Sequence, residues 1–236
     1  MKIPASLSRI VPGEFTSTPP AVSLLAANLV TIVFAVAGSW DAATVMFIYW
    51  AQSVIIGIFT VLSLLGADSA ALAAGMEKSL RESGGSGKVS MRFTLFYQCL
   101  LAGFFTLHYG LFHWGYYSII VESGLFGTVH FSSPDLWISC GIFFANHLYS
   151  HLYYRDDKRG AVDYVNEQFF RPYFRIFPMH LTIIFGAMVI LVLTLAGITT
   201  TLPVLVLFLA IKTYTDVEMH VRKHAGETGL FPGTMA

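Results

Sequence analysis

The residues best suited to chemistry form a stripe near the end of the chain. Lys212, Asp216 and His220 follow one another at intervals of four residues, so on a helix they lie on one face. An aspartate and a histidine one helical turn apart can hold the same metal ion. Ionisable side chains are costly inside a membrane helix and usually face a bundle interior, a partner or a cavity. The stripe is therefore the first predicted site.

Three histidines that could join this site, His108, His147 and His180, lie in other apolar runs of the sequence. Counting about 1.5 Å per residue from the predicted helix ends, His180 and His147 are about 12 Å deep, Asp216 about 9 Å and His108 about 20 Å. The similar depths of His180, His147 and Asp216 predict one layer in the cytoplasmic half of a membrane, which His108 would join only if its span starts later or tilts. Its core is His180, Asp216 and His220, and the fourth ligand is His147 or His108.

Imidazole and carboxylate ligands without cysteine suit Zn²⁺, and also Fe²⁺ or Mn²⁺. Three protein ligands and one open position would lower the pKa of a bound water towards about 7 and generate a nucleophile. Lys212 would orient Asp216 or stabilise an oxyanion, so these two are the predicted catalytic residues. Arg171 and Arg175, at the cytoplasmic mouth, suit an anionic substrate head group.

The composition predicts a polytopic membrane protein. Of 236 residues, 55% are hydrophobic and 12% charged, whereas about 25% are charged in a typical soluble domain. The formal charge of zero argues against a nucleic-acid partner. Cys99 and Cys140 both lie in apolar runs and are interpreted as buried free thiols.

The elements that must position these residues are apolar runs long enough to cross a bilayer, which takes about 20 residues. They predict an all-α bundle of six membrane helices in a single domain, with charged loops at 66–92 and 155–170. The first loop would hold a short interfacial helix from Ala70 to Leu80 and a Gly/Ser linker. Lysine and arginine fall on one side only, so both termini are predicted to be cytoplasmic. The spans are expected at 21–38, 42–65, 93–121, 135–154, 172–198 and 203–222.

Four motifs stand out between about Phe47 and His224. They are Tyr49-Trp50-Ala51-Gln52-Ser53, His108-Tyr109-Gly110, Arg171-Pro172-Tyr173-Phe174-Arg175-Ile176 with Met179-His180, and Lys212-Thr213 with Asp216 and His220. Together they resemble an uncharacterised family of prokaryotic multi-pass membrane proteins, in which an acidic residue would be expected in place of Gln52. A multi-pass protein of the cell (inner) membrane is expected. The resemblance brings no established activity. It implies that His108, His147, His180, Asp216 and His220 belong to the shared pattern.

The function that these residues favour is metal binding, with hydrolysis of an amide or ester of a lipid-like substrate as the expected reaction. Scattered histidines and an aspartate are similar in style to membrane zinc hydrolases of the ceramidase and adiponectin-receptor group, but the order and number of motifs differ. No HExxH or GxSxG motif is present. The alternatives are a haem protein with His147 and His180 as axial ligands, an ion transporter or sensor, and a scaffold held by polar contacts. The sequence leaves a homo-oligomer open.

Overall fold

The computed structural model describes residues 26, 28–31, 33–34, 38, 40–153, 161–198, 200–209 and 211–212. Within these residues the chain forms helices and no strand, which confirms the all-α prediction. A C-terminal helical segment, defined here as residues 202–209 with 211 and 212, follows the last numbered helix. The numbered elements are α2 (Ala42–Leu65), α3 (Ser69–Glu82), α4 (Met91–Tyr117), the π-helix η1 (Ser118–Glu122), α5 (Pro134–Tyr153) and α6 (Ala161–Leu195).

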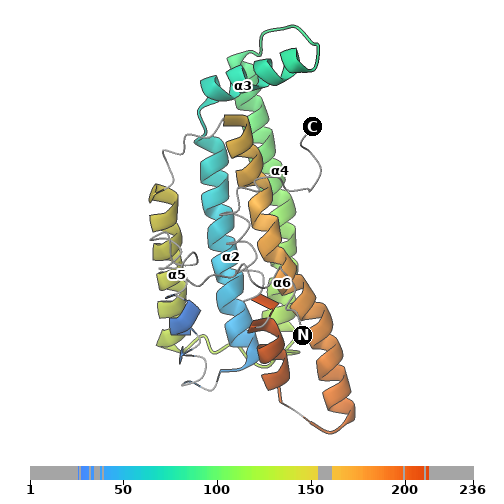
Figure 1. Cartoon of the computed structure of the whole chain (residues 1–236). Helices are drawn as coiled ribbons and strands as arrows, with labels where there is room; N and C mark the ends of the chain where they lie inside the picture. The colour runs from blue at the N-terminus through green and yellow to red at the C-terminus, as the bar shows by residue number, and fades with distance from the viewer. Residues whose placement is uncertain are drawn as a thin grey trace, which may run out of the picture.

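Helix α2 is the centre of the bundle (Figure 1). It packs against α4, α5 and α6, whereas α5 makes little contact with either of the other two. Every residue from Ala42 to Tyr49 is buried. A helix that is apolar on all sides gains most by being surrounded, which explains why α2 takes this position.

The helices alternate in direction between two ends of the bundle. At one end, which we call the α3 end, α3 lies across the other helices (Figure 1). At the opposite end, the loop end, two loops meet the start of α2: Ala43 N donates to Phe126 O at 2.9 Å, and Ala42 N donates to Thr201 Oγ1 at 3.5 Å. Lys78, Arg81, Lys88 and Arg92 lie at or near the α3 end, while 122–133 and 196–201 contain no lysine or arginine.

The corner between α2 and α3 is fixed by one buried amide. Gln98 of α4 donates through Nε2 to Leu64 O at 3.3 Å and to Ala67 O at 2.9 Å, and its Oε1 accepts from Ser69 Oγ at 2.7 Å. These contacts supply partners for backbone carbonyls at the end of α2, which a helix terminus leaves without helical partners.

Replacing Gln98 with leucine should therefore destabilise the protein by about 2 kcal/mol, since it leaves buried polar groups without partners. The measurement is the unfolding free energy of the detergent-purified protein. A matched control is Gln168→Leu, which removes the same side chain from α6, at a position that makes none of these contacts with the corner. Equal losses in the two variants would contradict this role of Gln98.

Three of the described helices are long and apolar enough to cross a membrane: Ala42–Leu65, the continuous Met91–Glu122 and Ala161–Leu195. The first two coincide with, or closely follow, the expected runs 42–65 and 93–121. Helix α5 occupies Pro134–Tyr153, close to the expected 135–154. Most of the expected span 21–38, and the part of 203–222 after residue 212, lie outside the described residues.

The start of α6 differs from the prediction. The expected loop at 155–170 ends at the latest before Ala161, where α6 begins, so Pro172 lies inside the helix and not in its first turn. Val165 is buried, and Val162 lies against Gly75 of α3. These contacts stabilise the helical conformation of a charged stretch. Their contribution outweighs the loss of the backbone hydrogen bond that Pro172 cannot donate.

Candidate functional site

Lys212 is held in a defined place at the end of the described chain. Its Nζ donates to Asn28 Oδ1 at 2.9 Å and lies 4.2 Å from the ring centroid of Tyr49. An ammonium group over an aromatic face is attracted by the negative charge of the ring surface. The first residue of the predicted stripe is thus docked against the central helix.

Tyr49 also joins the C-terminal helical segment to α5. Its ring centroid lies 5.3 Å from that of Phe208 and 5.8 Å from that of Phe143. Lys212 comes one turn after Phe208, and His147 comes one turn after Phe143. The rings of Tyr49, Phe143 and Phe208 form what we call the aromatic layer. Residues four apart share a helix face, so Lys212 and His147 both lie on the α2 side of their helices, one turn beyond this layer.

His147 contacts the polar patch of α2. Gln52 Nε2 and His147 Nε2 lie 3.1 Å apart. Which group donates in this pair depends on the tautomer of His147 and on the orientation of the Gln52 amide. One turn further along α5, His151 Nδ1 lies 3.3 Å from Ser63 Oγ of α2. Both imidazoles of α5 therefore face the central helix.

His108 and His180 lie instead on the seam between α4 and α6, where both are exposed. His108 Nδ1 lies 3.1 Å from the hydroxyl of Tyr173, and His180 Nδ1 lies 3.2 Å from the hydroxyl of Tyr116. The two contacts are eight residues apart on α4 and seven apart on α6, or about 11 Å along the helices. The two imidazoles thus belong to separate contacts two turns apart.

The order in depth is the reverse of the one expected from sequence. His108 is level with Tyr173, whereas His180 lies two turns further from the α3 end. The reason is the earlier start of α6, since the eleven residues from Ala161 to Arg171 add about 16 Å of helix.

His180 does not lie on the face of α6 that meets the C-terminal helical segment. A Cβ on Gly186 would lie 2.9 Å from Val204 Cγ1, so Gly186 marks the face of α6 that meets this segment. That face recurs seven residues earlier, at the buried Met179. The next residue, His180, is rotated by about 100° from it. His180 therefore lies beside Tyr116 of α4, on a different face of α6 from the one that meets the C-terminal helical segment.

The remaining predicted residues are only partly described. Asp216, His220 and the side chain of Arg175 lie outside the described part of the structure. Arg171 Nη1 lies 4.0 Å from Glu167 Oε1, one turn earlier on α6. Among the described residues, no group of three or more His, Cys, Asp or Glu side chains is close enough to hold a metal ion. The described histidines His108, His147 and His180 thus do not form one centre.

A buried polar network on α2 and α4 was not predicted as a site. Tyr109 OH donates to Ser53 O at 3.0 Å and accepts from Ser53 Oγ at 2.7 Å. His113 is buried, stacks on the Tyr109 ring and donates from Nδ1 to Tyr109 O at 2.8 Å. Trp50 Nε1 donates to His113 O at 2.8 Å. The signal in the sequence was the polar patch Tyr49 to Ser53 at an unusual depth.

Comparison with known families gives one match over most of the chain. A family model described as a family of unknown function (DUF6498) matches residues 11–229. The chain belongs to this family. The resemblance to an uncharacterised family is thereby confirmed, while the match does not address the individual motifs. The matched range includes Asp216 and His220. Comparisons with curated proteins and with solved structures gave no match.

Proposed function

We propose that this DUF6498 protein is a metal-binding integral membrane protein with His147, Asp216 and His220 as ligands. The observation that carries the proposal is the docking of Lys212 on Tyr49, beside the face of α2 that receives His147. A helix continuing past Lys212 would bring Asp216 one turn and His220 two turns further along the same face. His147 and, one turn further, His151 are the histidines of α5 that face the central helix in this region, and His147 is the one that belongs to the proposed ligand set.

The membrane part of the proposal is a multi-pass protein of the cell (inner) membrane with six spans and both termini cytoplasmic. Three helices long and apolar enough to cross a bilayer support it. The charge distribution supports the orientation, because lysine and arginine gather towards the α3 end and are absent from both loops of the loop end. By the positive-inside rule the α3 end is cytoplasmic.

The proposed chemistry is hydrolysis of an amide or ester in a lipid-like substrate. A divalent ion, zinc in first place and iron or manganese otherwise, would supply an activated water. Lys212, fixed between Asn28 and Tyr49, is placed to act as the cation that orients Asp216 or stabilises an oxyanion. Arg171 and Arg175 on α6 would receive an anionic head group.

The test is elemental analysis of the detergent-purified protein beside an Asp216→Ala/His220→Ala variant. We expect about one zinc, iron or manganese per chain in the wild type and none in the variant, because losing two of three ligands leaves no stable site. An absorption spectrum without a Soret band would separate this site from a haem. No stoichiometric metal in the wild type, even after reconstitution with zinc, would refute the proposal.

A second candidate is a scaffold whose histidines only fasten helices together. The observation in its favour is that each of four histidines has an uncharged polar partner on a neighbouring helix. The pairs are His147 with Gln52, His151 with Ser63, His108 with Tyr173 and His180 with Tyr116. Metal content separates the two candidates. A haem bound between His147 and His180 is disfavoured, because α2 lies between α5 and α6.

A further inference from the structure

The Gly/Ser stretch after α3, expected to be a flexible linker, is fastened back onto that helix. Gly84 N donates to Arg81 O at 3.0 Å, and Gly85 N donates to Leu80 O at 2.9 Å. At its far end, Val89 N donates to Glu77 Oε1 at 2.8 Å. The segment from α3 to the start of α4 is thus one folded unit at the α3 end.

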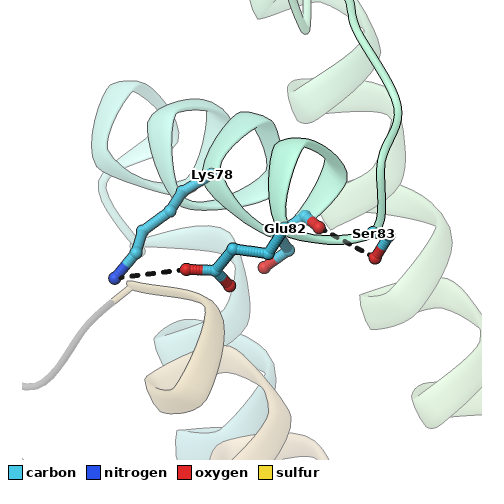
Figure 2. A network of polar contacts seen from close by, with 4 residues as sticks. Lys78, Glu82 and Ser83 are labelled. Atoms are coloured by element: carbon cyan, nitrogen blue, oxygen red, sulfur yellow. Dashed lines mark hydrogen bonds and ion pairs between the residues drawn. The ribbon is translucent and has the colours of Figure 1, made fainter.

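The acidic side chains of this unit already have partners. Lys78 Nζ lies 3.8 Å from Glu82 Oε1, as Figure 2 shows. Asp68 accepts from two backbone N–H groups at the start of α3, at 2.9 and 3.1 Å. Glu77 accepts from Val89 N. The carboxylates are therefore engaged with Lys78 and with the backbone.

Three basic side chains of this unit are not paired with its carboxylates. Arg81, Lys88 and Arg92 are exposed and form no ion pair within the described part of the chain. Exposed apolar side chains stand beside them, with Met91 47% and Phe93 54% exposed at the start of α4. Because α4 is long and apolar enough to cross a membrane, this mixture of cations and apolar groups is typical of a membrane–water boundary.

We propose that Arg81, Lys88 and Arg92 form a binding surface for the phosphate groups of anionic phospholipids in the leaflet at the α3 end. Guanidinium groups make paired, charge-assisted hydrogen bonds to phosphate oxygens. The apolar side chains of Met91 and Phe93 would meet the acyl chains of the same lipids. The hydrogen bond between Val89 N and Glu77 holds Lys88 near α3, so lipid binding does not have to order a flexible segment.

The experiment is native mass spectrometry of the full-length protein titrated with phosphatidylglycerol and, separately, with phosphatidylcholine. The wild type should retain phosphatidylglycerol preferentially. Each basic residue near an anionic surface strengthens binding about fivefold, so Arg81→Gln/Lys88→Gln/Arg92→Gln should weaken phosphatidylglycerol binding by roughly 100-fold at low salt. Far-UV circular dichroism checks folding, which these exposed, unpaired side chains should not affect.

Lys78→Gln is the matched control for Arg81→Gln, since both remove one positive charge from α3. Lys78 is already paired with Glu82, so its replacement should change phosphatidylglycerol binding less than about twofold, against about fivefold for Arg81→Gln. Equal effects of the two variants, no lipid preference in the wild type, or equally strong competition by inorganic phosphate would each overturn the proposal. The readout is lipid retention and does not depend on the proposed metal site.

Discussion

Replacing His147 with alanine should remove the metal from the purified protein, whereas replacing His180 with alanine should leave it bound. His147 lies on α5 against Gln52, one turn beyond the aromatic layer that also positions Lys212. Loss of a ligand should weaken metal binding by more than 100-fold, since even outer partners of ligands contribute about 10- to 100-fold. Metal content per chain, measured after equilibration with a weak chelator, gives the result.

His180→Ala and His108→Ala are the controls for this prediction. Both imidazoles bond to tyrosines on the exposed α4–α6 seam, so either variant should keep the wild-type metal content. If His180→Ala loses metal as completely as His147→Ala, then His180 is a ligand, as the sequence predicted. Retention in all three variants, with loss in Asp216→Ala/His220→Ala, would mean that the remaining ligands come from elsewhere.

The positions of the helices followed from the sequence wherever an apolar run sets both ends. Helix α2 covers Ala42–Leu65, the residues expected, because it has no charged residue, Asp41 precedes it and Gly66 follows it. The start of α6 could not be predicted in the same way. Its first turns are charged and precede Pro172, and they are helical because Val162 and Val165 find partners in the folded chain. Local propensity gave no sign of those contacts.

Residue type was enough to choose the candidate ligands, but the sequence could not predict which of them lie close together. The depth of a residue depends on where its helix begins, and the error at α6 displaced His180 by about 16 Å. The rotation of a helix depends on its packing. His180 faces Tyr116 of α4 because its neighbour Met179 lies on the buried side of α6. Spacing along the sequence depends on neither quantity, so Lys212 and Asp216 would share one face of any helix that contains both.

The loop 123–133 approaches the start of α2 most closely at Gly127. Gly127 has φ +93°, a conformation that L side chains rarely adopt. A Cβ at this position would lie 2.6 Å from Asp41 Cγ and 2.8 Å from Asp41 Oδ2. The same Oδ2 accepts from Thr128 N at 3.1 Å, and Thr44 Oγ1 bonds to both Thr128 O and His130 N at 3.1 Å. Moving Asp41 aside would therefore disturb the loop that Thr44 also holds.

Gly127→Ala should destabilise the protein by about 3 kcal/mol, by adding backbone strain and by weakening the bond between Asp41 and Thr128. Gly124→Ala is the matched control, because Gly124 has φ +67° but a Cβ added there would meet no heavy atom within 4 Å. It should cost only about 1 kcal/mol, from the left-handed backbone alone. The comparison is made by unfolding the detergent-purified proteins and following far-UV circular dichroism. If the two substitutions destabilise equally, the contact with Asp41 contributes nothing, and backbone conformation accounts for the need for glycine at both positions.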